Sequence, residues 1–514
     1  MLLRAGLALL LGLSAACAVE APEEEVGTGA QEIVNGTMTS EFPATGMLIV
    51  GGVEAGAIQC SLTLIGCDTV LTAAHCVCQG FGSDCSSIDA SQFHVFFPNA
   101  GFFPVASVEV NPTYNESIEH DAAVLHLAEP VTGVKPVGIA SASVAAGAPA
   151  TIVGYGRVGG DVYEYGLKRE GSVTTTACSP ELGANKLCWL YDGSASSSDS
   201  NVCHGDSGGS TYVMNGSGDY EVVGVHSTTN QDTCLASPGT FESADTGVYD
   251  HRDFIADMAA GSLAQATCGD LPQLGQEGAT VISETGRTNE SETARHTFEV
   301  PPGVAELRVA MNSTDGIGVN MDLWVKRGEE ANPSWYDCVA AGASAHGFCD
   351  MPSPQAGTYH VAMKDATGVG AEYQLTVTML MGAPIANEDV YSVGAGDVLA
   401  IDAAGGLLAN DVLGARGGPL TAFIDMQPAH GVVELADDGA FTYTPQDDYA
   451  GPDSFLYRAS DGSYEGAAYV TLTVGGSGDD GGMSAGCAVA PRSPSGLLLV
   501  LMALILTFRR RRRS

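Results

Sequence analysis

Basic residues are scarce in this sequence of 514 residues, which has 21 Lys and Arg against 61 Asp and Glu and a formal net charge of −40. A chain this acidic is repelled by nucleic acid, so we exclude nucleic acid as a partner. The acidity indicates a well-solvated surface, with substrate steering as the alternative. No C-x-x-C pair is accompanied by a second pair or by histidines in register, so the sequence predicts no zinc site and no metal in the functional site.

Long stretches of helical periodicity are also missing, apart from a short helix expected at 249–264. Short apolar and β-branched runs alternate instead with Asn-Gly and Asp-Gly turns, which is typical of β-strands. The chain is too long for one ordinary domain. We therefore predict an all-β protein, with folded bodies at 33–268, 293–381 and 384–475, a linker at 269–292, and a spacer and C-terminal tail at 476–514.

The N-terminal segment resembles an export signal. Residues 1–18 combine one early arginine, an apolar run and small residues, as in a secretory signal peptide, and residues 19–32 then form a propeptide. Lipid attachment at Cys17, as in bacterial lipoproteins, is an open alternative. Export favours disulfides over free thiols, and 12 of the 14 cysteines remain for pairing when Cys17 and Cys487 are assigned to terminal signals.

The C-terminal segment joins a short apolar run at 497–508 to a block of arginines. The run is shorter than the ~20 residues that comfortably cross a bilayer. The arrangement resembles the MYXO-CTERM sorting tails of bacterial surface proteins, which implies Cys487 as the processing site and a sorting machinery as partner. A plain tail anchor is the alternative. Both interpretations place the folded bodies outside the cytoplasmic membrane, at the cell surface or secreted.

Three motifs supply the side chains of acyl-transfer chemistry. They are VLTAAHCV with His75, HDAAVLHL with Asp121, and HGDSGGS with Ser207. A serine hydroxyl is a weak nucleophile, so an imidazole must take its proton, and a buried carboxylate must orient the imidazole. With IVNG at the start and GVHS and GVYDHRDFI near the end, the region 33–262 resembles the chymotrypsin-like serine proteases. The resemblance implies a double six-stranded β-barrel.

The resemblance also implies a role for each residue. His75 is expected as the general base, Asp121 as its orienting partner and Ser207 as the nucleophile of a serine endopeptidase. The backbone amides of Gly205 and Ser207 are expected to form the oxyanion hole. The substrates would be proteins or peptides, and no cofactor would be required. A surface adhesin with an inert protease-like domain is the alternative.

Activation by cleavage is a further implication of the resemblance. A new N-terminus at Ile33 would pair with Asp206, beside the nucleophile, and shape the oxyanion loop. The bond to be broken follows Glu32, where the family usually has a basic residue. An enzyme that prefers Glu before the scissile bond could activate itself, and a separate activating protease is the alternative.

The substrate pocket, assigned by position in the family, departs from the trypsin-like pattern. Asn201 stands at the base, where an aspartate would hold Lys or Arg, and this argues against a basic preference. His226 stands where glutamyl endopeptidases have a histidine, which can donate to a substrate carboxylate. A preference for small or medium apolar residues, with His226 packing against the barrel, is the alternative. The other implied pocket residues are Ser227 near the catalytic aspartate, His204 and Thr229 as further donors, and Gly247 as the opposite wall.

Disulfide pairs follow from the same resemblance. The implied pairs are Cys60–Cys76 beside the histidine, Cys203–Cys234 beside the pocket, and Cys178–Cys188 as a looser match. Cys78 and Cys85 are paired only from their proximity along the chain. Cys67 and Cys268 receive no partner.

The two C-terminal bodies are expected to be β-sandwiches. Residues 293–381 resemble the bacterial pre-peptidase C-terminal domain, with Cys338 bridged to Cys349, and residues 384–475 resemble bacterial cadherin-like, immunoglobulin-like repeats. Acidic and amide side chains in the last body suit Ca²⁺, although the same residue types also form turns. The Ca²⁺ candidates are Asn387, Asp389, Asp411, Asp453 and Asp461. The oligomeric state is left open.

Overall fold

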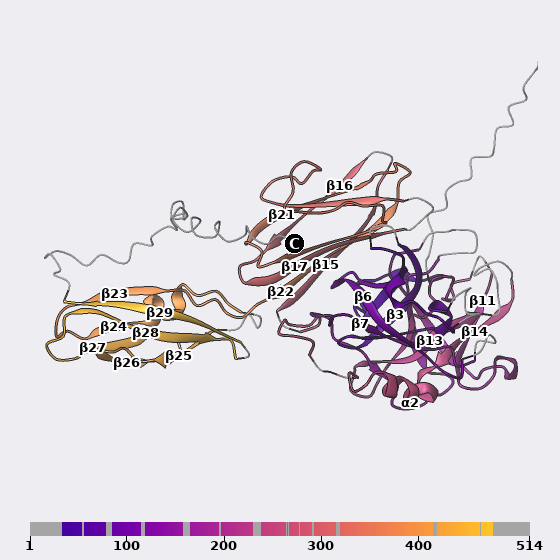
Figure 1. Cartoon of the computed structure of the whole chain (residues 1–514), viewed down its shortest axis with the longest axis horizontal. Coiled ribbons are helices and arrows are strands. Elements are labelled where there is room, and N and C mark those ends of the chain that lie inside the picture. Colours follow the sequence, from indigo (N-terminus) through magenta and orange to yellow (C-terminus); the bar gives the residue numbers. More distant parts are fainter. Residues whose placement is uncertain are drawn as a thin grey trace, which may run out of the picture.

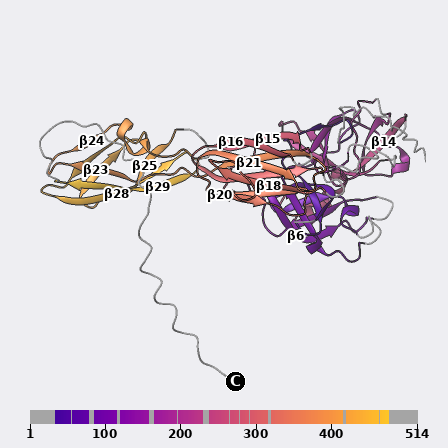
Figure 2. The same cartoon turned by 90° about the horizontal axis from the view of Figure 1, so that it is seen from above.

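The computed structural model describes residues 33–475, with gaps at 54–55, 79–84, 115–118, 158–164, 195–196, 230–237, 264, 266, 277, 290–291, 315–318, 415–418 and 463. The expected signal peptide, propeptide and C-terminal tail lie outside the described residues, and with them Cys17, Glu32 and Cys487. Two views show three β-rich bodies in a row, with the middle body between the other two (Figures 1 and 2).

The N-terminal body consists of two closed β-barrels, as the sequence predicted. The first barrel has the antiparallel strand order β2-β3-β4-β7-β6-β5. In the second, β9 pairs with both β10 and β12 and so closes the order β10-β11-β14-β13-β12-β9, while β1 pairs with β10 and β8 with β13. The strands are β1 (Thr37–Met38), β2 (Thr45–Val50), β3 (Ala57–Gly66), β4 (Thr69–Thr72), β5 (Phe93–Phe97), β6 (Gly101–Val110), β7 (Ala123–Leu127), β8 (Gly138–Ile139), β9 (Pro149–Gly154), β10 (Arg169–Thr176), β11 (Lys186–Asp192), β12 (Ser210–Met214), β13 (Tyr220–Thr229) and β14 (Thr240–Gly247).

Apolar side chains from both barrels form one buried core. Leu62 and Val70 of the first barrel and Val222 of the second are fully buried in the same cluster. All four residues of β4 are buried, so this strand shows no alternation between buried and exposed positions. The strand ends and connecting loops are thereby fixed on a rigid scaffold, where functional side chains are usually found.

One α-helix is described, α2 (Val248–Met258), and it packs on β13 and β14 (Figure 1). It is shorter than the expected 249–264, because Ala260 and Gly261 have φ values of +50° and +89° and leave helical geometry. In the part of the chain that the structure describes, no helix is long and apolar enough to span a bilayer. Short 3₁₀ helices lie at η1 (Ala74–Cys76), η2 (Ala90–Gln92) and η3 (Pro180–Leu182).

The middle body is a sandwich of two four-stranded sheets, ordered β15-β22-β17-β20 and β16-β21-β18-β19. Its strands are β15 (Ala279–Arg287), β16 (Thr293–Val300), β17 (Val304–Ser313), β18 (Met321–Arg327), β19 (Cys338–Ala340), β20 (His346–Pro352), β21 (Gly357–Asp365) and β22 (Glu372–Met381). The expected linker at 269–292 is therefore wrong in part, since it contains β15. This strand pairs with β22 along its whole length but only at the edge of the sheet, so most of its side chains are half-exposed or exposed and its composition reads as a linker.

The C-terminal body is a second sandwich, ordered β23-β29-β28-β25 and β24-β27-β26. Strand β29 alternates between exposed and buried residues, as expected for a strand with one face on a core. Its strands are β23 (Asp389–Val393), β24 (Leu399–Ile401), β25 (Thr421–Met426), β26 (Gly431–Leu435), β27 (Phe441–Pro445), β28 (Gly451–Ser460) and β29 (Glu465–Val474), with 3₁₀ helices η4 (Ala403–Gly405) and η5 (Leu407–Ala409).

The middle sandwich packs directly against the first barrel. Ala310 of β17 is buried in one apolar cluster with Met47, Phe96 and Tyr155. Polar contacts cross the same boundary, and the guanidinium of Arg308 donates to the Thr132 carbonyl over 2.7 Å. The barrel domain and the sandwich thus share a buried interface rather than being joined only by a tether.

Five disulfides are resolved among the described residues. The pairs Cys60–Cys76, Cys78–Cys85, Cys178–Cys188 and Cys338–Cys349 confirm the expected pairing. Cys67 and Cys268, which the sequence left without partners, bond to each other. Cys203 is also disulfide-bonded, and its expected partner Cys234 lies outside the described residues.

Candidate active site

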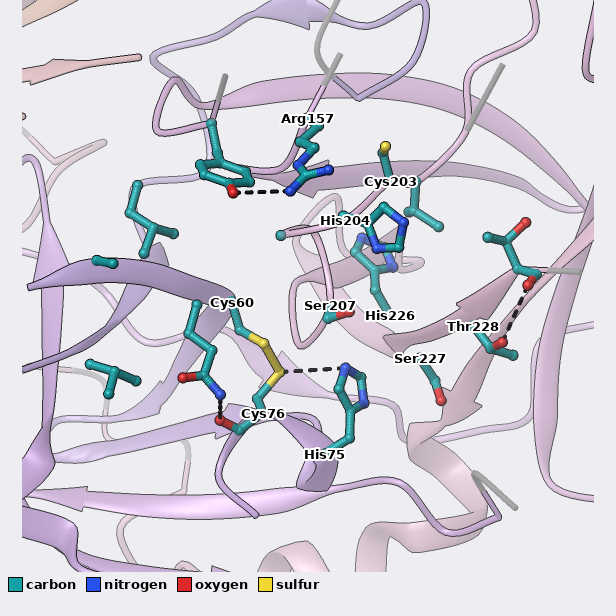
Figure 3. A pocket seen from close by; sticks show the side chains of 18 residues that line it. Cys60, His75, Cys76, Arg157, Cys203, His204, Ser207, His226, Ser227 and Thr228 are labelled. Carbon is teal, nitrogen blue, oxygen red and sulfur yellow. Dashed lines mark hydrogen bonds between the residues drawn. A yellow bond between two sulfur atoms is a disulfide. The ribbon is translucent and has the colours of Figure 1, made fainter. Parts of the chain in front are cut away.

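His75, Asp121 and Ser207 come from three different parts of the barrel pair. His75 lies in η1 after β4, Asp121 precedes β7, and Ser207 lies in the turn before β12. The His75 Nδ1 atom is 2.7 Å from Asp121 Oδ2, and the His75 amide donates to Oδ1 over 2.9 Å. Ser207 faces the His75 ring across the pocket (Figure 3). No hydrogen bond joins these two described side chains, a looseness common in sites without substrate.

Asp121 is fully buried and accepts three hydrogen bonds. Ser227 Oγ donates to Oδ2 over 2.7 Å, in addition to the two donors of His75. Burial alone favours the neutral acid, but the hydrogen bonds and charge of His75 hold the pKa of Asp121 below its ordinary value. Asp121 therefore remains ionised and fixes the tautomer of His75, which leaves Nε2, 3.8 Å from Cys76 Sγ, as the nitrogen that can accept a proton.

The turn at 203–208 contains two residues of the pocket lining, Gly205 and Ser207, whose backbone amides matter for catalysis. Gly205 has a φ of +94°, which favours glycine, and a side chain there would meet Gly156 at 3.0 Å. Neither the Gly205 amide nor the Ser207 amide donates to a backbone oxygen in the described part of the chain. Both amides are thus available to a developing oxyanion.

Asp206 and Ile33 are buried beneath this turn. Asp206 accepts hydrogen bonds from the amides of Gly156 and Cys203, over 2.7 and 2.8 Å. Burial raises the pKa of Asp206 to about 6, although these amides and the charge of His226 oppose the shift. Ile33 is fully buried in an apolar cluster that includes Val202, and Val34 forms a bridge with Asn201. The start of the described chain is already inserted into the second barrel.

His226 forms a buried ion pair that the sequence did not predict. Its Nδ1 lies 3.0 Å from Asp245 Oδ1, and Thr211 Oγ1 donates to the other Asp245 oxygen over 2.5 Å. Burial alone lowers the pKa of His226, but the charge and hydrogen bond of Asp245 raise it above its ordinary value. The His226 Nε2 atom is buried, and the Val153 backbone adds to the raised pKa of His226. The His226 imidazole thus lies in the pocket lining, and Asp245, Asp206 and the Val153 backbone favour its charged form.

Two expected pocket residues lie behind the pocket rather than in its lining. Asn201 is fully buried, and its Oδ1 accepts from Trp189 Nε1 over 3.2 Å and from Ser243 Oγ over 2.6 Å. The indole of Trp189 thus holds Asn201 away from a substrate. Gly247 is the residue before α2, where its amide donates to the Asn185 carbonyl. His204, His226, Ser227 and Thr229 do line the pocket.

Arg157 and Tyr165 also line the pocket, and no sequence motif pointed to them. Arg157 Nη2 donates to the Tyr165 hydroxyl over 3.1 Å, and the guanidinium lies 5.0 Å from the Tyr165 ring centre. Among the described lining residues none is acidic, although the chain is rich in acidic residues. The described lining thus contains a guanidinium and no carboxylate.

No resident metal fits the active site. The Sγ atoms of Cys60 and Cys76 lie close to a ring nitrogen of His75, the one cluster with metal-like spacing among the described residues. These sulfurs are bonded to each other, so they are not thiolate ligands.

The calcium candidates of the C-terminal body divide into two sets. The Asn387 amide donates to Asp411 Oδ1 over 2.8 Å, and the Asn410 side chain donates to Asp389 Oδ1. The Oδ2 atoms of Asp389 and Asp411 are buried without partners among the described residues. Burial and the nearby charge of Asp411 raise the pKa of Asp389 to about 7.

Asp453 and Asp461 do not belong to this group. Asp453 accepts from the Ala429 and His430 amides and from the Tyr443 hydroxyl. Asp461 accepts from the Tyr464 amide. Asp453, in β28, thus caps the turn at 429–430, and Asp461 stabilises the turn that leads to Tyr464.

Comparison with known proteins gives two matches to protein families. The trypsin family matches residues 33–247, and the bacterial Ig domain family matches residues 382–474. The serine protease SP24D of Anopheles gambiae is 31% identical over 206 residues, which cover 38% of this chain and 70% of that protein. The first match spans both barrels, and the second spans the C-terminal sandwich.

Proposed function

Because the N-terminal part of this chain belongs to the trypsin family of serine proteases, we propose that the protein is an active serine endopeptidase that uses Ser207, His75 and Asp121. The observation that carries the proposal is the buried Asp121 carboxylate. It orients His75 over 2.7 Å, at the pocket that Ser207 lines. An inert relative would not need this buried charge, which is costly unless fully hydrogen-bonded.

The mechanism follows from the arrangement of these groups. His75 Nε2 takes the proton of Ser207 Oγ as the oxygen attacks the substrate carbonyl, and Asp121 stabilises the imidazolium that forms. The Gly205 and Ser207 amides then hold the oxyanion of the tetrahedral intermediate. His75 then protonates the leaving amine. In the second half of the reaction His75 takes a proton from the water molecule that attacks the acyl-enzyme, and it returns this proton to Ser207 Oγ.

We propose that cleavage between Glu32 and Ile33 activates the enzyme. Asp206 is buried with two amide donors and a raised pKa, so a nearby ammonium group would stabilise its charged form. Ile33 already lies in the adjacent buried cluster. The new N-terminus therefore has a short way to move before it pairs with Asp206.

We further propose that the pocket prefers Glu before the scissile bond. The support is the position of His226 in the lining, the Asp245 carboxylate that favours its charged form, and the lack of acidic residues in the described lining. The Glu that precedes Ile33 agrees with this preference, since the enzyme would then cut its own activation site. Asn201 plays no direct part in it.

The preference can be tested with peptides that differ only in the residue before the scissile bond, namely Glu, Gln, Ala, Phe and Lys. On protein that starts at Ile33, we expect kcat/KM for Glu to exceed that for Ala by roughly 10- to 100-fold, since a hydrogen bond to a charged group contributes about 1.5–3 kcal/mol. His226→Ala should remove the advantage of Glu and leave Ala cleavage nearly unchanged. If the enzyme prefers Ala or Phe, and still does so after His226→Ala, the acidic preference is wrong and His226 only packs against the barrel.

The same preference should depend on pH. The His226 imidazolium binds a carboxylate, and the raised pKa of His226 means that this form persists above the ordinary value of about 6.5. The ratio of kcat/KM for Glu and Ala should thus be high at low pH and fall as pH rises through the pKa of His226. The ratio cancels the ionisation of the catalytic triad. Asp245→Asn should shift the fall to lower pH, and a ratio that stays flat from pH 6 to 9 would contradict the proposal.

We propose that the protein is exported and displayed at the cell surface. Five disulfides among the described residues favour an oxidising compartment. The N-terminal signal and the C-terminal tail, processed at Cys487, would supply export and sorting. The two sandwiches would then separate the protease from the envelope.

For the C-terminal sandwich we propose a Ca²⁺ site at Asp389 and Asp411. Two buried carboxylate oxygens without partners suit a hard cation. Calcium should raise the melting temperature of the full chain relative to EGTA, because an excess of about 100 Kd stabilises the folded state by about 2.7 kcal/mol. Asp389→Asn should abolish the shift and the control Asp461→Asn should retain it. An equal shift in both variants would place any calcium elsewhere.

A further inference from the structure

One wall of the active-site pocket is built by Arg157 and Tyr165. Arg157 lies on the side of the pocket away from Thr228 (Figure 3), and its Nη2 donates to the Tyr165 hydroxyl. The chain enters this wall at Tyr155 and leaves it at Gly166, where the Gly166 amide donates to the Tyr155 carbonyl over 3.0 Å. This hydrogen bond holds Tyr155 and Gly166, the two ends of the wall, next to each other.

The middle sandwich holds both ends of this wall. Tyr155 is fully buried in the apolar cluster that contains Ala310 of β17. Asn312, two residues further along β17, donates its Nδ2 to the Gly166 carbonyl over 2.8 Å. Gly166 has a φ of +115°, and a Cβ there would lie 2.5 Å from the Ser313 carbonyl. Only glycine allows so close an approach of the sandwich.

The wall is joined in turn to the oxyanion loop. The Tyr155 amide donates to Ser61 Oγ over 3.0 Å, and Ser61 Oγ donates to the Gly205 carbonyl over 2.9 Å. The Ser61 amide also donates to the Ser207 carbonyl over 2.9 Å. A hydrogen-bonded path therefore runs from the sandwich to the peptide groups that flank the nucleophile.

Asn312 is also an unusual residue to place in a purely structural interface. It is fully buried, and its Oδ1 has no hydrogen-bond partner among the described residues. A buried amide oxygen without a partner costs free energy that an apolar side chain would not. What the amide provides is its Nδ2 donor, which bonds to the Gly166 carbonyl over 2.8 Å and at the longer distance of 3.4 Å to Gln374 Oε1.

We propose that the middle sandwich is a positioning module of the protease, and that Asn312 is the positioning residue through which it fixes the oxyanion loop. The proposal rests on the proposed serine endopeptidase activity. Asn312 does not touch the substrate; it acts through Gly166, Tyr155 and Ser61. The sandwich is thus required for the rate of acylation as well as for stability.

The test compares substitutions at two points of the same interface in the full-length protein. Asn312→Ala removes the donor to Gly166, and Asn312→Leu removes it while keeping most of the volume. The matched control is Thr378→Val, because Thr378 Oγ1 accepts from Asn99 Nδ2 over 3.0 Å at a point away from the pocket wall. Each variant is measured for melting temperature, for kcat and KM, and for the rate of Ser207 labelling by a fluorophosphonate.

We expect the Asn312 variants to lower kcat and the labelling rate by about tenfold with little change in KM, since a small displacement of the oxyanion donors reduces the chemical step. Thr378→Val should lower the melting temperature to a similar extent and keep kcat within about twofold. Equal kcat in the Asn312 and Thr378 variants would overturn the proposal.

A double-mutant cycle tests the path itself. Ser61→Ala breaks the path at its other end, so its effect on kcat should not add to that of Asn312→Leu. An additive double mutant would also overturn the proposal. Hydrogen exchange of residues 202–209 gives a readout independent of activity, and exchange should be faster in Asn312→Leu than in Thr378→Val. Absence of labelling in the activated wild type would instead refute the endopeptidase, whereas unchanged exchange in Asn312→Leu would refute the positioning role alone.

Discussion

Ser207→Ala is expected to lower kcat of the activated protein by about 10⁴- to 10⁶-fold. The hydroxyl is the nucleophile in the proposed mechanism, and the other labelled serine of the lining, Ser227, donates to Asp121 instead (Figure 3). The assay is cleavage of the best peptide of the series above. Fluorophosphonate labelling provides a second measurement that does not depend on peptide preference.

The control for Ser207→Ala is Ser217→Ala, the same change in an exposed turn between β12 and β13. His75→Ala should cost nearly as much as Ser207→Ala, and the double variant should be little worse than either, because the groups act as one unit. If Ser207→Ala cleaves like the wild type, or if the activated wild type is not labelled, the proposed mechanism is wrong. The protein would then be better described as a surface adhesin with an inert protease-like domain.

Asp206→Asn is expected to lower kcat/KM of protein that starts at Ile33 by roughly 10²- to 10³-fold. The substitution leaves the inserted ammonium buried without its counter-charge, and breaking a buried ion pair costs about 3–5 kcal/mol. Part of this cost appears as a distorted oxyanion loop, the turn at 203–208, because Gly205 and Ser207 flank Asp206. The measurement is kcat/KM after sequencing has confirmed Ile33 as the N-terminus.

The matched control is Asp219→Asn, which removes an exposed carboxylate that pairs with Lys135 at 3.5 Å. That change should leave kcat/KM within about twofold, as exposed pairs contribute little. Wild-type activity in Asp206→Asn would contradict the activation mechanism while leaving the triad untouched.

The uncut chain offers a pH test of the same residue. The raised pKa of about 6 means that ionised Asp206 destabilises the uncut fold at pH 7 and that protonation relieves this cost. The free energy of unfolding of the uncut wild type, relative to Asp206→Asn, should therefore increase as pH falls from 7 through 6.

The sequence was sufficient for the features whose chemistry is local. Ser207 lies between Asp206 and two glycines, His75 precedes a cysteine, and Asp121 begins an apolar strand. Each motif can therefore be recognised from a few neighbouring residues. The double barrel follows from the same motifs, and the structure confirms the all-β fold. Strands with one buried face, such as β29, could also be predicted, because their alternation of apolar and polar residues is local.

Features that depend on register or distant packing were not predictable. Asp245 meets His226 only because β13 and β14 pair in a register that sets them opposite each other. Asn201 leaves the pocket because the indole of Trp189 holds it, which no spacing reveals. Strand β15 was assigned to a linker because an edge strand keeps a polar composition. The contact of Asn312 with Gly166 joins residues 146 positions apart.

The Cys67–Cys268 disulfide has a consequence for a protein that digests other chains. It closes a loop whose ends are 201 positions apart, and this loop contains His75, Asp121 and Ser207. A single nick in any exposed segment of that loop leaves both fragments covalently joined and still attached to the sandwich that follows. Damage by neighbouring copies of the enzyme would therefore show as two bands only after reduction, and a nicked molecule would keep its whole catalytic apparatus in one piece.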